Sequence, residues 1–266
     1  MNRVISKISQ YLQEFWRYRD LLKLLVEKSV KLKYRRSVLG YIWSVLNPLM
    51  IMVVMTLVFS TMFNRNIENF PVYLFCGQLL FNFMKNSTEQ AISSITGNAA
   101  LLKKSYVPKY IFTLARITGS LVDLVFSLAA LLIVMIATGT RFTFYMLLFP
   151  LVLVQLYVFC VGLGLFLAQA NVFFRDTQFI YGAVLTAWRY LTPIFYPMEM
   201  LPERLVWCIE HLNPMYFYVR QFRDLIHVGC LPSAQTVLAG CVTAVLMLLI
   251  GLCMFMRSRD KFILHI

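Results

Sequence analysis

The chain has 266 residues, of which 60% are hydrophobic and only 14% charged, and its mean hydropathy is +0.71. A soluble domain would carry about 25% charged residues, so this composition excludes an ordinary soluble protein and predicts an all-α, multi-pass membrane protein. The net charge of +13 does not indicate a nucleic-acid partner, because the cations flank apolar segments and form no basic domain of their own.

The N-terminal segment, residues 1–36, is expected to be a cytoplasmic, amphipathic interface segment. Residues 3–18 place apolar side chains at helical spacing on one face, with polar residues opposite and Trp16 near the end. Such a helix suits a membrane surface, where it either anchors the chain or docks a cytoplasmic partner. Charges interrupt the first 30 residues, so no cleavable signal peptide is expected.

Six apolar segments, within a transmembrane domain over residues 37–266, are each near the ~20 residues that a bilayer core requires. They cover roughly residues 38–63, 71–96, 111–138, 143–169, 178–196 and 235–256. The terminal segments and loops that alternate onto one side hold 17 of the 25 Lys and Arg residues, against 5 on the other side. The positive-inside rule therefore predicts that both termini are cytoplasmic.

Asn47-Pro48 lies about a third of the way through the first predicted span. Proline frees a backbone carbonyl and can kink a helix. A bilayer tolerates this only where protein or a water-lined path covers the break. We therefore predict a structural role for this pair, as a hinge beside the cationic anchor at residues 31–36.

Polar side chains follow one face of the second predicted span. Lys85 and Glu89 are four residues apart and can neutralise each other, and Asn82 and Asn86 share their stripe. The stripe suits the wall of a water-filled path or a contact between subunits. Ion-coupled carriers also bury ionisable groups, but Asp123 in the third span fits a structural pairing role better.

Aromatic residues make up 15% of the chain, and many fall toward the outer half of the predicted spans. An interfacial aromatic belt explains this distribution. A surface on which sugar rings stack is the functional alternative. On that interpretation the candidate path residues, aromatic and polar, are Phe59, Tyr73, Asn82, Asn86, Glu89, Trp188, Tyr190 and Tyr196.

The last outside loop, about residues 197–234, is predicted to contain two short helices. Pro202 can open the first, which continues to Leu212, and the second runs from Tyr216 to His227 before Gly229 stops it. Both carry apolar faces, so they are expected to dip into the membrane edge. Cys208 and Cys230 share this loop, where a disulfide is possible although no spacing demands it.

Enzyme motifs are missing from the sequence, and no Cys/His spacing indicates a metal site. The nearest approach to a phosphate-binding Walker A loop, GNAALLKKS at 97–105, has Leu102 where the second glycine belongs. This chain is therefore not expected to be an enzyme or to bind a cofactor. If transport is active, another polypeptide or an ion gradient must supply the energy.

Six stretches together resemble the membrane subunit of type-2 ABC exporters that move lipid-linked polysaccharides such as O antigen, capsule or teichoic acid. In order they are KYRRSVLGYIWSVLNPL at 33–49, VFSTMF at 58–63, NAALLKKSYVPKYI at 98–111, NVFFRD at 171–176, TPIFYPMEMLP at 192–202 and LNPMYFYVRQFRD at 212–224. The resemblance covers most of the chain.

This resemblance implies an inner-membrane permease that works as a homodimer with two copies of a separate ATPase, on which ATP and Mg²⁺ bind. The substrate would be a polyprenyl-linked glycan. The resemblance also assigns a coupling helix that touches the ATPase, with the candidate residues Leu101, Lys103, Lys104, Tyr106 and Pro108. The lysines are explained equally by a positive-inside loop.

The two short outside helices would form part of an external gate, with candidates Pro202, Trp207, Pro214 and Tyr216. Arg175-Asp176 is expected to be structural, since an ion pair could hold the turn between the fourth and fifth spans. Two alternatives stay open: a type-2 exporter of drugs or small lipids, and an ion-coupled carrier or channel.

Overall fold

A computed structural model of the chain describes residues 16–34, 40, 42–63, 67–104, 107–258 and 261–262, all in helices, turns and short connections. The α-helices are α2 (Arg19–Tyr34), α3 (Ile42–Phe63), α4 (Phe70–Ile92), α5 (Ala99–Lys104), α6 (Tyr110–Ala137), α7 (Phe149–Phe173), α8 (Thr177–Leu191), α9 (Glu203–Leu212), α10 (Pro214–Arg223) and α11 (Ala234–Ser258). Shorter turns are η1 (Thr96–Asn98), η2 (Phe144–Leu148), η3 (Met198–Met200) and the π-helical η4 (Asp224–Val228).

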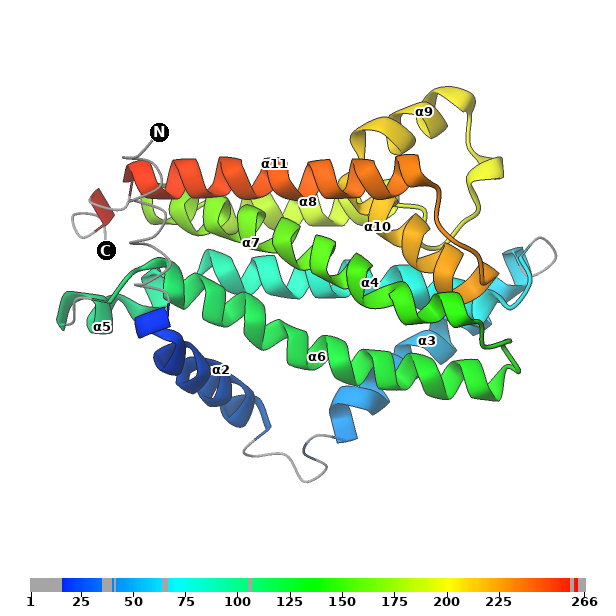
Figure 1. Ribbon diagram of the computed structural model, residues 1–266, viewed down its shortest axis with the longest axis horizontal. Coiled ribbons are helices and arrows are strands. Elements are labelled where there is room, and N and C mark those ends of the chain that lie inside the picture. Colours follow the sequence, from blue (N-terminus) through cyan, green and yellow to red (C-terminus); the bar gives the residue numbers. More distant parts are fainter. Residues whose placement is uncertain are drawn as a thin grey trace.

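The long helices α4, α6, α7, α8 and α11 run side by side along the longest axis of the molecule (Figure 1). Helices α2 and α5 lie at one end, which we call the α5 end, and α9, α10 and η4 lie at the other, the α10 end. Helix α4 occupies the centre, since it packs against α3, α6, α7, α8 and α10.

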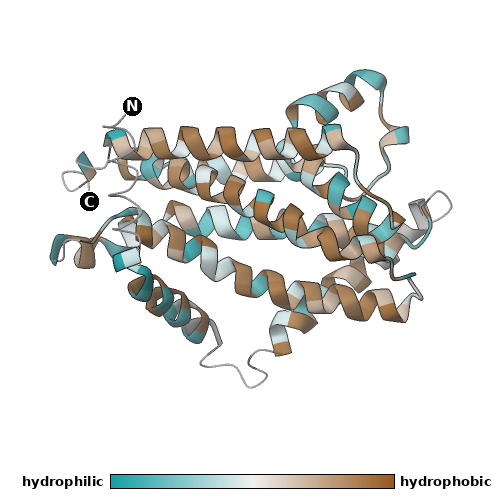
Figure 2. Cartoon of the chain, viewed as in Figure 1, coloured by the Kyte–Doolittle hydropathy of each residue, from teal (hydrophilic) through white to brown (hydrophobic). Residues whose placement is uncertain are grey.

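Within the described residues, four helical stretches are long and apolar enough to cross a membrane: Ile42–Phe59, Tyr110–Ala137, Phe144–Phe173 and Ala234–Ser258. They correspond to the first, third, fourth and sixth predicted spans, and Figure 2 shows their apolar character along α7 and α11. The chain is therefore a multi-pass, all-helical membrane protein in its described part.

The other two predicted spans correspond to α4 and α8. At 1.5 Å per residue, the 23 residues of α4 are long enough to cross a bilayer core, but polar side chains dilute their hydropathy. Helix α8 has 15 residues and ends at Leu191, whereas the sequence predicted a span to residue 196. Thr192 leaves the helical region because Pro193 follows it, and a residue before proline is pushed into extended backbone.

The segment between α8 and α11 contains two short helices, α9, which follows Pro202, and α10. The second helix begins at Pro214, two residues earlier than predicted, and its last turn widens into η4. Gly229 ends it with a positive φ of 76°, a conformation that glycine adopts without strain. Cys208 and Cys230 are both free.

The predicted amphipathic helix at residues 3–18 lies almost entirely outside the described residues. The structure instead describes α2, which the sequence analysis did not distinguish within residues 1–36. Helix α2 is polar along much of its surface (Figure 2) and packs against α6. The contact is close because Gly119 of α6 has no side chain: a Cβ there would lie 3.0 Å from Ser29 Oγ.

Helix α3 continues through Asn47 and Pro48 without a break in its assigned range. It packs on α6 and α4, and most of its apolar side chains, such as Val54 and Leu57, are exposed within the single chain. Much of this helix is therefore left for lipid or for another subunit to cover.

Candidate functional site

The residues that link α9 and α10 to the bundle gather at the α10 end. Asn213 joins the start of α10 to the end of α8. Its Oδ1 accepts hydrogen bonds from the backbone N–H of Met215 at 3.0 Å and from Trp188 Nε1 at 2.7 Å. Its Nδ2 donates to the Leu191 carbonyl and to Thr192 Oγ1, each at 3.1 Å. Asparagine at the N-cap followed by proline is a strong helix start, so local sequence opens α10, and the bonds to α8 and Thr192 set its position.

Arg223, at the end of α10, is buried and held by backbone carbonyls. Its guanidinium donates to the carbonyls of Tyr73 at 3.2 Å, Pro193 at 2.6 Å and Ile194 at 3.0 Å. The same group lies 3.5 Å from the centroid of the Tyr73 ring, as a cation–π contact. Gly77 of α4 makes room for it, since a Cβ there would lie 2.9 Å from Arg223 Nη2. Arg223 thereby clamps α10 to α4 and to the turn after α8.

His227 in η4 adds a second link, to the connection between α3 and α4. Its Nε2 lies 2.6 Å from the Glu68 carbonyl, which only accepts, so this nitrogen donates. The ring also meets Tyr73 edge-on at 5.7 Å. Burial, together with the nearby Arg223 charge, lowers the pKa of His227, although the hydrogen bond to Glu68 acts in the opposite direction.

A cavity of about 380 Å³ lies between these anchors and the external helices. It is lined by aromatic, acidic and basic side chains. The polar and aromatic members are Glu68, Tyr73, Glu199, Tyr216, Arg220, Arg223, Asp224 and His227. Carboxylate and guanidinium groups can hydrogen-bond a polar ligand such as a sugar, and phenol rings can stack on its ring.

Four polar side chains tie α9 to α10 beside this cavity. Arg220 Nη1 donates to the Tyr216 hydroxyl at 2.9 Å, and that hydroxyl donates to Glu210 Oε1 at 3.1 Å. Arg220 Nε lies 3.9 Å from Asp224 Oδ1. Burial raises the pKa of Asp224, and the Arg220 charge partly offsets this. The predicted gate residue Tyr216 therefore belongs to a connected network.

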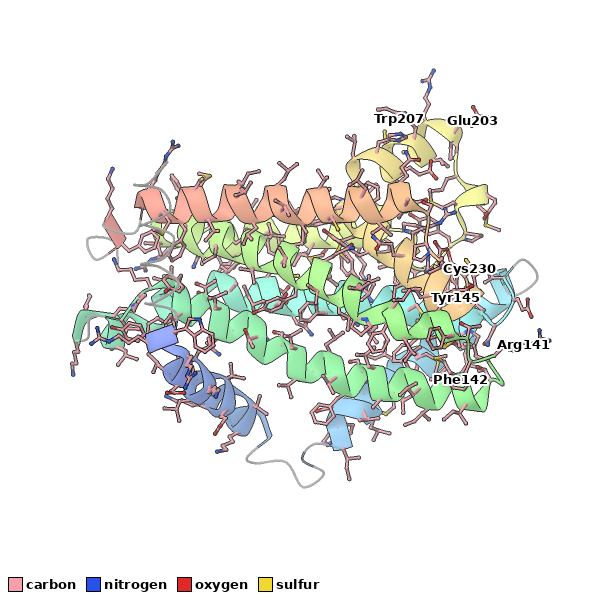
Figure 3. The ribbon with its side chains drawn as sticks, in the orientation of Figure 1. Arg141, Phe142, Tyr145, Glu203, Trp207 and Cys230 are labelled. Atoms are coloured by element: carbon pink, nitrogen blue, oxygen red, sulfur yellow. The ribbon has the colours of Figure 1, made fainter. Side chains whose placement is uncertain are left out.

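The other predicted gate residues lie at helix boundaries or on the outer surface. Pro202 precedes α9, and Pro214 is the first residue of α10. Trp207 and Glu203 lie on the part of α9 that projects from the side of the bundle (Figure 3). The Trp207 ring is more than half exposed and stacks on His211 at 4.8 Å.

Four of the five predicted aromatic path residues form a connected group with Phe195. The Phe195 ring stacks on Phe59 at 5.4 Å and lies 6.5 Å from Tyr190. The Tyr196 hydroxyl donates to the Tyr190 carbonyl, and the Tyr73 hydroxyl donates to the Tyr196 carbonyl at 3.1 Å. We call these five residues the aromatic cluster. It joins the outer parts of α3, α4 and α8.

Trp188, the fifth predicted aromatic residue, lies apart from this cluster. It packs edge-on against Phe159 at 6.3 Å and, besides bonding Asn213, lines an apolar groove of about 430 Å³ together with Leu205 and Leu212 of α9. Its position indicates that it supports α9 and α10.

The polar stripe of α4 lies on the half of the helix nearer the α5 end. Asn86 and Glu89 are exposed within the single chain, and Asn82 is partly exposed. Lys85 Nζ and Glu89 Oε1 form the expected i,i+4 ion pair, at a long 4.0 Å. The stripe and the aromatic cluster therefore occupy different levels of the bundle.

The predicted coupling residues lie on and after α5. Leu102 is buried, whereas Leu101 is 44% exposed and both Lys103 and Lys104 are exposed. The Pro108 carbonyl accepts a hydrogen bond from the Ile111 N–H at 3.1 Å and so starts α6. Tyr106 lies outside the described residues.

Arg175 and Asp176 form the turn between α7 and α8, with both side chains exposed. Neither makes an ion pair with any residue that the structure describes. The turn is held by backbone bonds, in which the Asp176 carbonyl accepts from Phe179 at 3.0 Å and from Ile180 at 3.1 Å. The structural assignment of this pair stays a prediction, without the expected ion pair.

Arg223, His227, Asn213 and Arg220 were not among the predicted site residues. The sequence carried a signal for Arg223, since it lies four residues after Val219 and three before Ile226, on the buried face of an amphipathic helix. A cation at such a position needs partners from other elements. Asn213 before Pro214 marks a helix boundary in the sequence. No local pattern indicates the bonds that Asn213 and His227 make to distant segments.

Comparison with known proteins places this arrangement in a family. Residues 20–227 match the family described as ABC-2 type transporter. The O-antigen export system permease protein RfbA of Myxococcus xanthus is 32% identical over 251 residues, which cover 94% of this chain and 96% of that protein. The RfbA permease of Klebsiella pneumoniae is 26% identical over 91% of this chain and 93% of its own length. The polysialic acid transport protein KpsM of Escherichia coli is 21% identical over 91% and 96%, respectively. The chain is therefore a member of the ABC-2 type transporter family.

Proposed function

We propose that this chain is the permease subunit of an ATP-driven exporter that moves a lipid-linked polysaccharide of the O-antigen or capsule type across the inner membrane. The observation that carries this is the similarity, over more than nine tenths of the chain, to permeases of O-antigen export systems. The aromatic cluster supports it, because aromatic faces pack against the C–H-rich faces of sugar rings.

In this proposal α4 and α8 complete a set of six spans, and two copies of the chain enclose the path. The exposed face of α3 and the exposed polar stripe of α4 support a second copy, since neither is covered within the single chain. Asn82, Asn86 and Glu89 would line the path near the α5 end. Phe59, Tyr73, Tyr190 and Tyr196 would line it near the α10 end.

The α5 end would face the cytoplasm with both termini, and α5 would contact a separate ATPase through Leu101, Lys103, Lys104, Tyr106 and Pro108. A short helix that presents one exposed leucine and two lysines is suited to docking on a soluble protein. At the opposite end, α9 and α10 would form the external gate. Asn213 and Arg223 would hold the gate to the bundle, and the Tyr216 network would couple its two helices.

The test is reconstitution of the chain with the ATPase encoded beside it, in vesicles that contain a polyprenyl-linked glycan. We expect ATP-dependent movement of the glycan and hydrolysis that the glycan stimulates. A matched vesicle with an ATPase mutated in its Walker A lysine should show neither. If the two proteins do not associate, or hydrolysis proceeds without glycan movement, the proposal is wrong. Loss of drug resistance with normal surface glycan in a deletion strain would favour a drug or lipid exporter instead.

A further inference from the structure

A small polar cavity lies between α2 and α6 at the α5 end, far from the aromatic cluster and the external helices. Its volume is about 80 Å³, and Lys28 of α2 and Arg116 of α6 both line it. Ser29 and Asn98 supply the other polar side chains, while Leu25 and Phe112 form an apolar wall. Exposed Lys28 and partly buried Arg116, from different helices, thus line one partly open cavity.

Among the residues that the structure describes, no carboxylate lines this cavity. The nearest acidic residue along α2, Glu27, is already paired with Lys31 at 3.3 Å. Like charges in one partly enclosed space repel each other unless an anion lies between them. An anion would therefore complement the two cations that line this cavity.

The position of the cavity along α6 indicates what kind of anion it would bind. Helix α6 has 28 residues, which is about 42 Å at 1.5 Å per residue, close to the full thickness of a bilayer with its headgroups. Arg116 lies six residues, or roughly 9 Å, from the start of α6, near the boundary of headgroups and hydrocarbon. Its long side chain can extend toward the headgroup level.

We propose that Lys28 and Arg116 form a binding site for the phosphate group of a membrane lipid. A guanidinium binds phosphate oxygens in a bidentate manner and an ammonium adds a mobile point charge. The wall formed by Leu25 and Phe112 would contact the first carbons of the lipid chain. The close approach of α2 to α6 at Ser29 and Gly119 brings together the two helices that carry these cations.

The phosphate has two sources. One is the headgroup of an anionic phospholipid, and the other is the phosphate of a polyprenyl carrier, a source that rests on the proposed function. The experiment uses the purified full chain in detergent micelles and measures, by native mass spectrometry, its affinity for phosphatidylglycerol and for undecaprenyl phosphate. Diacylglycerol, which has no phosphate, is the reference probe.

We expect the double variant Lys28→Gln, Arg116→Gln to bind the phosphate lipid roughly tenfold more weakly, since the charge-assisted hydrogen bonds to phosphate are lost. The matched control is Lys23→Gln, Arg257→Gln, which removes the same charge from exposed positions at the same end and should bind as the wild type does. The single variant Lys28→Gln, at an exposed position, should lose less affinity for the phosphate lipid. It tests the site if the double variant fails to fold.

A loss confined to undecaprenyl phosphate identifies the carrier as ligand, and a loss that includes phosphatidylglycerol identifies a phospholipid site. Equal binding by the wild type and the double variant overturns the proposal, and so does an equal loss in the control. Binding of phosphatidylglycerol needs neither an ATPase nor a glycan. A failure of the export assay would therefore leave this result standing.

Discussion

At the residue scale, the α10 end depends on a buried cation, Arg223, that binds backbone carbonyls. Arg223 donates hydrogen bonds to three backbone carbonyls, one in α4 and two in the turn after α8, and its guanidinium lies over the Tyr73 ring. Buried carbonyls that lose their donor retain their desolvation cost, so the loss of one side chain would strand several polar groups at once.

We expect Arg223→Gln to lower the free energy of unfolding by about 3 kcal/mol, because glutamine is too short to reach three carbonyls. Thermal unfolding of the purified chain in detergent measures the change. Arg204→Gln, on the exposed surface of α9, should stay within about 0.5 kcal/mol of the wild type. Equal Tm values for the two variants would mean that Arg223 does not clamp α10.

His227 gives the same region a defined pH dependence. Its pKa is lowered in the folded chain, mainly by burial, so as the pH falls below about 6.5 the unfolded chain binds a proton more readily than the folded chain. The free energy of unfolding should therefore decrease from pH 6.5 down to the folded-state pKa. His227→Gln should flatten the plot of Tm against pH in this range, and His211→Gln, on the exposed face of α9, should not.

At the element scale, the contact between α7 and α11 is the most extensive in the described bundle, and two glycines allow it. A Cβ on Gly162 would collide with the backbone of Met247 and Leu248, and a Cβ on Gly251 would collide with the Gly162 carbonyl. The helices therefore touch backbone to backbone, the small-residue packing that membrane helices use when hydrophobic burial cannot drive association.

Gly251→Ala should destabilise the chain by about 1–3 kcal/mol, since the new methyl group forces α11 away from α7. Gly182→Ala on α8 is the control, because a Cβ there has no neighbour within 4 Å in its own chain. Helix propensity predicts that this change is neutral or stabilises by up to about 0.8 kcal/mol. The yield and Tm of folded protein in detergent distinguish the two, and comparable losses would contradict the packing argument.

The external helices combine local and distant determinants. Pro214 and Gly229 delimit α10 and η4 through backbone chemistry that the sequence displays. The attachment of these helices depends on bonds from Asn213, Arg223 and His227 to segments far away in the chain, such as Glu68, 159 residues from His227.

At the scale of the whole molecule, transport should depend on surfaces that the single chain leaves exposed. Tyr190 is 65% exposed although it lies within the aromatic cluster, so its ring is available to a ligand. Tyr145, on η2, is also exposed at the α10 end but lies outside the cluster (Figure 3).

We expect Tyr190→Ala to slow glycan export roughly two- to tenfold at unchanged protein level, the loss of one aromatic stacking contact. The initial rate in reconstituted vesicles, normalised to the amount of permease, measures it. Tyr145→Ala should export at the wild-type rate. If Tyr190→Ala lowers the export rate and the protein level in equal proportion, the aromatic cluster stabilises the protein as an interfacial belt and does not contact the glycan.

The α5 end should respond to charge in a different assay. The double change Lys103→Glu, Lys104→Glu should weaken the coupling of ATP hydrolysis to export while leaving membrane insertion intact. Both lysines are exposed on α5, where they can contact an ATPase. The control Lys23→Glu, Arg257→Glu carries the same charge change at the same end. If glycan-stimulated ATP hydrolysis is unchanged in the lysine variant, the two lysines serve only as the positive charges that orient the chain in the membrane.

The sequence by itself determined the membrane class, the four most apolar helices and the end of η4 at Gly229. Hydropathy, helical period, proline and glycine act over one to a few turns, so they can be interpreted without knowing the fold. The candidate aromatic residues were also visible, but as a composition bias and not as a cluster. The tertiary structure alone decided that Tyr73 bonds Tyr196 across 123 residues and Arg223 across 150. It also separated Trp188 from the cluster and placed α2 against α6. Such contacts depend on how whole helices pack, and in a chain whose spans are nearly uniformly apolar no local period records which face meets which neighbour.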